Sequence, residues 1–260
     1  MESILAQLLP MLNALWWPFC RILAMLISVP VLGESLTPVT IRILIALVLA
    51  FVMLPMSSHA VAIDPISLRG VMATVEQVMI GFVLGLAFHY VSSVLGVLGY
   101  LVSSQMGFAM ALMNDPMNGQ SSDVVSNLLT VLSIIVFFSI DGHLVISGVV
   151  GASFKAWPLG GGYGNLVLQT VAYNFAWIFA AAMLLAIPIV FSTMVVQLGF
   201  GLLNRVAPAL NLFALGFSMI TLFGLLMLTQ VIRFVPEHYI GMTNRILDMI
   251  QQQMQAAYHG

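Results

Sequence analysis

The sequence predicts an all-α, membrane-embedded protein built of helical hairpins. Of its 260 residues, 61% are hydrophobic and only 6% are charged, whereas about a quarter of the residues in an ordinary soluble domain carry a charge. The apolar residues also gather in long runs, and a helix needs about 20 predominantly apolar residues to cross a bilayer. Candidate spans lie near residues 14–33, 41–56, 71–101, 128–150, 171–203 and 209–232.

Composition and motifs argue against several classes of protein. The formal net charge of -2 comes from few groups of either sign, so no basic surface is available to bind nucleic acid. Cys20 is the single cysteine, which rules out an intrachain disulfide and a cysteine-based metal site. HExxH, GxSxG and Walker A motifs are missing, and the five histidines are scattered along the sequence. We therefore expect no catalytic residues, no metal and no cofactor.

Several of the apolar runs fit a simple membrane span poorly. The first run contains Arg21, and a cation inside a membrane is costly unless it faces protein or water. Glu2 stands where a secretory signal would carry a basic residue, so we expect this run to be retained. The second run is short and ends at Pro55, while the third and fifth are too long for one upright span. These misfits suggest that partner subunits surround much of the chain.

Glycines at short spacing mark possible helix contacts. Gly81 and Gly85 form a GxxxG pattern, and Gly199 and Gly201 add a second pair of small residues. Such residues let helix backbones approach closely inside a bilayer. The pattern fits packing within this chain as well as packing against a partner.

Residues 105–123 separate the third run from the fourth. Methionines occupy the first part of this segment, at Met106, Met110 and Met113, and breakers follow at Asn114-Asp115-Pro116. Methionine is flexible and polarizable, so this stretch has the properties of a deformable seal. A helix end followed by an exposed loop, with the methionines in ordinary core contacts, is the other interpretation.

The fourth run is interrupted at Asp141-Gly142-His143. An Asp-Gly pair indicates a turn or a helix cap. A proton relay through His143 is disfavoured, because no second carboxylate or histidine stands at helical spacing. Further along, residues 236–258 carry apolar side chains at helical spacing among polar ones. This is the pattern of an amphipathic helix.

Residues 199–217 place a polar tip between the fifth and sixth runs. Pro208 should end the helix that arrives from Phe175 near Asn204, which leaves Arg205 at a helix C-terminus, where the dipole favours a cation. With Asn211, these residues form either a water-facing loop between two spans or a docking site for a partner.

Several of these segments together resemble the FliR family of flagellar export-gate proteins, whose injectisome counterparts are the SctT-type proteins. Each short motif is weak alone, but their order and the length of the chain also fit, and the resemblance covers nearly the whole sequence. The matching segments are Gln105-Met106-Gly107 with Asp115-Pro116, Asp141-Gly142-His143-Leu144, Pro158-Leu159-Gly160-Gly161, and residues 201–208 with Asn211, Phe213 and Gly216-Phe217.

The resemblance implies a subunit of a protein-export gate in the bacterial inner membrane, at the flagellar basal body. Family members assemble with several copies of FliP and FliQ into a closed channel that passes unfolded flagellar subunits. By this likeness, residues 1–165 form a FliP-like part and residues 166–260 a FliQ-like helical hairpin. The hairpin tip at 204–208 would then lie on the cytoplasmic side, near FlhB.

The resemblance also makes residues 105–123 the plug of the channel. Relatives tend to carry aromatic residues where this chain has Met110 and Met113, so the chemistry of the seal differs here. Met106, Phe108, Met110 and Met113 would form the apolar seal, next to Gln105, and Asn114, Asp115 and Pro116 would turn the segment back.

An autonomous small-solute transporter is the alternative. It predicts two related halves with broken helices that meet at the membrane midplane. The sequence shows no convincing internal repeat, and residues 199–217 have no counterpart elsewhere in the chain. A polytopic membrane enzyme is disfavoured by the missing catalytic groups.

Overall fold

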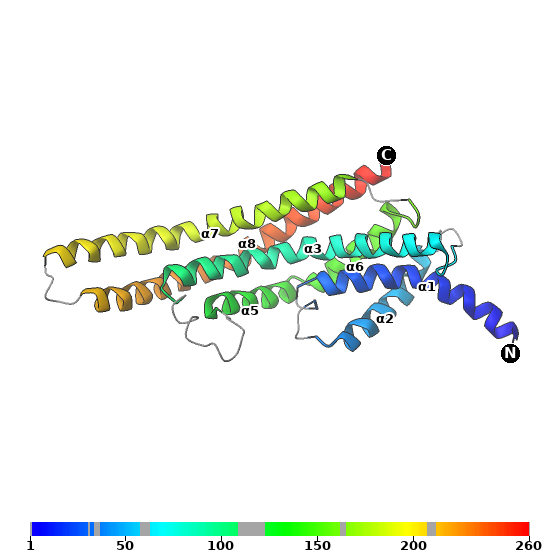
Figure 1. Cartoon of the computed structure of the whole chain (residues 1–260), viewed down its shortest axis with the longest axis horizontal. Coiled ribbons are helices and arrows are strands. Elements are labelled where there is room, and N and C mark those ends of the chain that lie inside the picture. Colours follow the sequence, from blue (N-terminus) through cyan, green and yellow to red (C-terminus); the bar gives the residue numbers. More distant parts are fainter. Residues whose placement is uncertain are drawn as a thin grey trace. The chain divides into compact units, whose positions relative to one another are not determined.

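The computed structural model describes residues 2–30, 32–33, 37–57, 63–108, 123–161, 165–206 and 212–259. All regular structure in these residues is helical, which confirms the all-α fold. The helices are α1 (Glu2–Ser28), α2 (Val39–Ser57), α3 (Leu68–Gln105), α5 (Val124–Ser139), α6 (Gly142–Ala156), α7 (Asn165–Val206) and α8 (Leu212–His259) (Figure 1).

The helices form two compact units that do not follow the order of the chain. The first unit contains Met1–Tyr90, Phe137–Asn174 and Thr243–Gly260, and the second contains Val91–Val136 and Phe175–Met242. Both units therefore combine segments from before and after residue 165. The division into a FliP-like part and a FliQ-like part, which follows chain order, stays a prediction.

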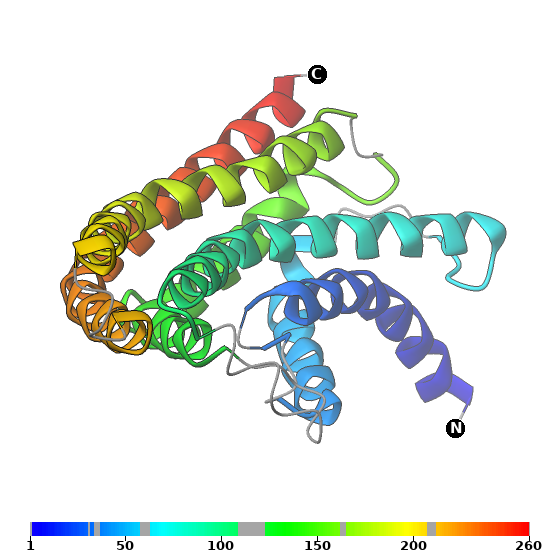
Figure 2. The same ribbon diagram turned by 60° about the vertical axis from the view of Figure 1, so that its left-hand side comes forward.

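In the first unit, α2 and the first half of α3 pack on α1. α1 and α2 lie side by side, and Figure 2 shows this pair clearly. α6 packs on α2, where a Cβ at Gly151 would reach the Met56 side chain. The first half of α3 approaches α1 at Gly81 and Gly85. The core of this unit includes Trp17, Ile22, Met25, Val29, Ala46 and Ala50.

In the second unit, the second half of α3 packs on α5, and α7 and α8 form a hairpin. The Ser126 hydroxyl on α5 donates to the Gly96 carbonyl on α3 at 3.1 Å. α7 and α8 lie side by side and antiparallel in both views (Figures 1 and 2), and Gly216 contacts Phe200. Fully buried apolar side chains of this unit include Val94, Leu95, Leu98, Val102, Leu129 and Ile189.

The break predicted at Asp141-Gly142 is confirmed. α5 ends at Ser139 and α6 begins at Gly142. Asp141 adopts a left-handed conformation with φ of 53°, which aspartate tolerates better than most residues. At Gly142, a Cβ would overlap the Phe137 ring, so glycine allows the chain to turn tightly here.

Helix α8 is longer than the sequence suggested. The amphipathic tail beginning at Pro236 is helical, but it is not a separate element, because α8 continues through Pro236. Packing on both sides of the proline favours continuity, since Val235 and Tyr239 are both 2% exposed. The amphipathic pattern holds, with a buried row at Tyr239, Met242, Ile246, Ile250 and Met254.

Five helices in the described residues are long and apolar enough to cross a membrane, or six if α5 and α6 count as one bent span. The spans are Pro10–Ser28, Val39–Ser57, Leu68–Gln105, Asn174–Val206 and Gly216–Ala257. They correspond to the apolar runs of the sequence. The chain is thus a multi-pass membrane protein by the length and composition of its helices.

Candidate functional site

Helix α3 ends in a backbone motif at residues 106–108. The Phe108 N–H donates to the Ser103 carbonyl at 3.0 Å, and the Gly107 N–H donates to the Ser104 carbonyl at 3.2 Å. Gly107 has φ of 80°. This is a Schellman cap, in which glycine takes the left-handed conformation because it has no Cβ. The cap fixes the direction in which the chain leaves α3.

Helix α8 contacts the same cap at three positions. The Thr221 hydroxyl donates to the Met106 carbonyl at 3.1 Å. Met106 is fully buried, and a Cβ at Gly224 would overlap its Cγ. A Cβ on Gly107 would lie 2.5 Å from the Phe217 ring. The end of α3 therefore rests directly on α8.

The structure places only the first part of the segment proposed as a plug. Gln105 and Phe108 are partly exposed at the end of α3, and Met106 is buried against α8. The remaining plug residues lie outside the described part of the chain, namely Met110, Met113, Asn114, Asp115 and Pro116.

Asp123 begins α5 on the other side of this segment. Its Oδ1 accepts from the Val125 N–H at 3.2 Å, and its Oδ2 accepts from the Ser126 hydroxyl at 2.8 Å. A carboxylate that satisfies free N–H groups in the first turn is an N-cap.

The hairpin tip is exposed where it is described. Asn204 and Arg205 lie in the last turn of α7, and both side chains face outward. A cation at this position is favoured by the negative end of the helix dipole. Pro208 and Asn211 lie outside the described residues.

Arg21 is a buried cation held by three helices and a turn. It is 1% exposed, although it lies inside the span Pro10–Ser28. Its Nε donates to Gln77 Oε1 on α3 at 2.8 Å, and Nη1 donates to Ser153 Oγ on α6 at 3.1 Å. Its Nη2 donates to the Trp157 carbonyl at 2.7 Å. The guanidinium group thus joins α1, α3, α6 and the turn after α6.

An aromatic contact and a nearby acidic residue offset the cost of burying this charge. The Phe154 ring lies 4.5 Å from Arg21 Cζ, in a cation–π arrangement. Glu76, beside Gln77, supplies a nearby negative charge. Arg21 faces protein, which removes the conflict between a cation and an apolar span. Its fork of donors suits this site because lysine could not reach divergent acceptors in the same way.

The glycines singled out in the sequence have different surroundings. A Cβ at Gly81 would overlap the Arg21 carbonyl, and one at Gly85 would overlap the Ser28 side chain. This pair therefore allows α3 to approach α1 within the chain. Among the residues that the structure describes, nothing lies within 4 Å of the corresponding positions at Gly199 and Gly201. Packing at this second pair stays a prediction.

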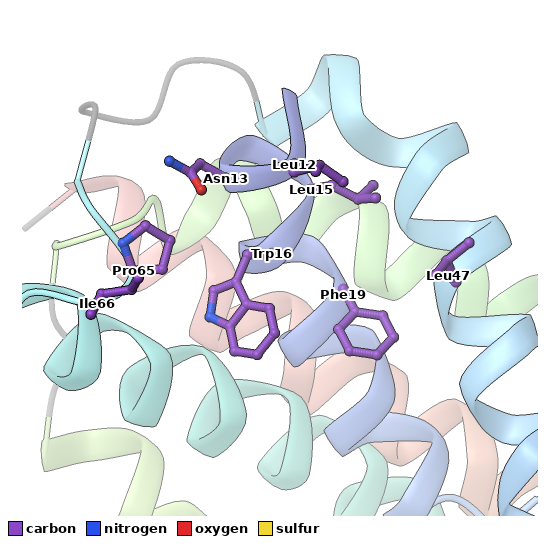
Figure 3. Close-up of a pocket in the computed structure, with 8 residues that line it drawn as sticks. All are labelled: Leu12, Asn13, Leu15, Trp16, Phe19, Leu47, Pro65 and Ile66. Carbon is purple, nitrogen blue, oxygen red and sulfur yellow. The ribbon is translucent and has the colours of Figure 1, made fainter. Parts of the chain in front are cut away.

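An apolar pocket of about 500 Å³ opens between α1, α2 and the turn before α3. Trp16 is fixed there, because its Nε1–H donates to Thr74 Oγ1 at 3.1 Å. Figure 3 shows Trp16 and Phe19 from α1 with Leu47 from α2. The walls suit a hydrocarbon group and offer few polar partners. Its lining residues are Leu12, Asn13, Leu15, Trp16, Phe19, Leu47, Pro65 and Ile66.

Metal chemistry finds no support in the described residues, which contain no group of three or more His, Cys, Asp or Glu side chains able to hold an ion. The features that stand out are instead helix contacts and apolar surfaces. The family model described as "Bacterial export proteins, family 1" matches residues 12–246. The chain belongs to this family.

Curated relatives of this export family cover most of the chain. A flagellar biosynthetic protein FliR from Pectobacterium carotovorum is 28% identical over 242 residues, which is 90% of each chain. The protein of the same name from Escherichia coli is 26% identical over 251 residues, covering 95% of this chain and 96% of its own. One from Bacillus subtilis is 24% identical over 205 residues. The resemblance drawn from the sequence is confirmed.

The sequence did not reveal the Arg21 network or the contact between α3 and α8. The sequence did indicate that Arg21 has polar partners, because a cation within an apolar run requires them. Nothing in the sequence identified Gln77 and Ser153 as those partners, because they lie 56 and 132 residues away. For the second, Gly224 gave no sign of its role, because a single glycine in an apolar helix has many explanations.

Proposed function

We propose that this chain is a flagellar export component and a core subunit of the export gate. In this proposal it assembles with several copies of FliP and FliQ into a closed channel, through which unfolded flagellar subunits pass. It acts at the flagellar basal body in the bacterial inner membrane. The chain itself catalyses no reaction and needs no cofactor. Family membership and the names of the relatives support this role.

The main support for assembly with partner proteins is an exposed apolar surface on α7. Within the most apolar 18 residues of the span Asn174–Val206, only 28% of the residues are buried within the chain. The large exposed side chains begin at Phe175 and end at Val206, with others at Phe179, Met183, Leu184, Ile187, Phe191, Met194, Val195, Leu198, Leu202 and Leu203.

This surface is too long for lipid alone to cover. At 1.5 Å per residue, the distance along α7 from Phe175 to Val206 is about 47 Å, whereas the hydrocarbon core of a bilayer is about 30 Å thick. Fitting the whole surface into that core would need a tilt of about 50°, beyond the usual range of about 0–40°. Part of the surface therefore requires protein cover, which the FliP and FliQ copies would supply.

Co-purification tests the assembly. The chain should be expressed with its own FliP and FliQ, extracted in mild detergent and sized by gel filtration with native mass spectrometry. We expect one large complex that contains all three proteins. A lone chain that stays folded and does not associate with either partner would contradict the proposal, and saturable binding of a small solute by that chain would favour a transporter.

We also propose that residues 105–123 form the plug of this channel. The described ends of the segment are both anchored, by the Schellman cap at Gly107 and by the N-cap at Asp123. The seal itself would come from Phe108, Met110 and Met113, whereas Met106, which is fully buried against α8, would anchor its base.

The hairpin tip is proposed to contact FlhB. Arg205 is exposed and stands at the end of α7, where it is available to an acidic or carbonyl-rich partner. We expect Arg205→Glu to reduce swimming motility several-fold, because it reverses the charge and opposes the helix dipole. Arg205→Lys, which keeps the charge, is the matched control. Normal spreading of the Glu variant in soft agar would contradict this contact and would favour a water-facing loop at Arg205.

A further inference from the structure

We infer that α8 positions the end of α3, and with it the base of the proposed plug, through Gly224, Thr221 and Phe217. The inference rests on the proposed function, and it adds the residues that would hold the end of α3 from which the channel seal begins. All of these residues lie within the second compact unit.

The first element of this contact is steric. Met106 is 0% exposed, and its Cγ lies where a Cβ on Gly224 would be. Only glycine lets the methionine side chain rest on the α8 backbone here. Because protein interiors are closely packed, any larger residue at 224 must move Met106 or separate the two helices.

The second element is polar and acts on the backbone of the same residue. The Thr221 hydroxyl lies 3.1 Å from the Met106 carbonyl and 3.0 Å from the Phe217 carbonyl of its own helix. At the end of a helix the last carbonyl groups have no partner within the helix. Thr221 is one turn before Gly224, so both contacts come from one side of α8.

The third element is the Gly107 cap. Its left-handed φ of 80° turns the chain away from α3, and Phe217 lies against the position that a side chain would take. A residue with a Cβ at 107 would be strained by its φ and would meet Phe217. Steric, polar and conformational constraints thus converge on two consecutive residues, Met106 and Gly107.

A size-swap experiment tests this inference in the full chain assembled with FliP and FliQ. Gly224→Leu should displace Met106 and raise ion leakage across the membrane toward the level of a strain lacking residues 105–118. Gly224→Leu combined with Met106→Ala should restore a tight gate, because the removed side chain makes room for the new one. Gly241→Leu is the matched control. Gly241 lies on the same helix, and no described residue lies within 4 Å of a Cβ at this position.

A second variant covers the case in which Gly224→Leu does not fold. Thr221→Val keeps the shape and removes one hydrogen bond, so we expect leakage to rise about fivefold. If the 105–118 deletion leaks while the Gly224 and Thr221 variants remain tight, the positioning role of α8 is wrong. If the deletion itself does not leak, the plug proposal fails instead.

Discussion

Gly81→Ala should destabilise the first compact unit by about 3 kcal/mol, at the upper end of the usual cost of overpacking. The added Cβ would overlap the Arg21 carbonyl, and a backbone atom cannot move aside as a flexible side chain can. Separating α1 from α3 would also pull Gln77 away from Arg21. The measurement is thermal unfolding of the detergent-solubilised protein, followed by circular dichroism.

Gly96→Ala is the matched control for this prediction. It lies on the same helix, and nothing occupies the space within 4 Å of its Cβ position. Alanine is a better helix former than glycine by about 1 kcal/mol, so this variant should be as stable as the parent or slightly more stable. Equal effects of the two substitutions would show that the close approach at Gly81 does not hold α1 and α3 together.

Arg21→Met should be the other strongly destabilising change, again by about 3 kcal/mol. Methionine fills most of the space but leaves the Gln77 amide oxygen and the Trp157 carbonyl buried without their donor, and each such group costs about 1–3 kcal/mol. Arg21→Lys should lose less, because it keeps the positive charge near Glu76 but cannot form the same fork of hydrogen bonds.

Arg205→Met is the matched control for the Arg21 variants. It removes the same charge from an exposed position in the last turn of α7, so its effect on stability should stay within about 0.5 kcal/mol. The temperature of unfolding should therefore fall for Arg21→Met and remain nearly constant for Arg205→Met. If the Arg21→Met protein unfolded at the same temperature as the parent protein, the network would not hold α1, α3 and α6 together.

The fold class and the positions of the helices could be predicted because they depend on local sequence. Apolar runs give helices of membrane-spanning length, and the Asp141-Gly142 pair gives the break between α5 and α6. The local sequence did not show whether the helix continues through Pro236, where the buried neighbours Val235 and Tyr239 favour an unbroken helix. Proline disfavours a continuous helix, and tertiary packing can outweigh this local effect.

The contacts between helices could not be predicted in the same way. Apolar helices have many possible neighbours, and small residues show only that a close approach is possible. Gly81 meets α1, whereas no described residue lies within 4 Å of a Cβ at Gly199, although both glycines were chosen by the same criterion. The sequence indicates that Arg21 has polar partners. Which side chains these are depends on how distant segments pack.

Site-specific photocrosslinking on α7 tests most directly whether protein covers the apolar surface. Photoreactive residues at Phe175 and Leu202 lie about 40 Å apart along the helix, so a bilayer core of about 30 Å cannot cover both in an upright helix. Buried Ile189 is the control position. In cells that express FliP and FliQ, we predict crosslinks to these proteins from at least one of the two exposed positions. Crosslinks only to lipid from both positions would contradict the account.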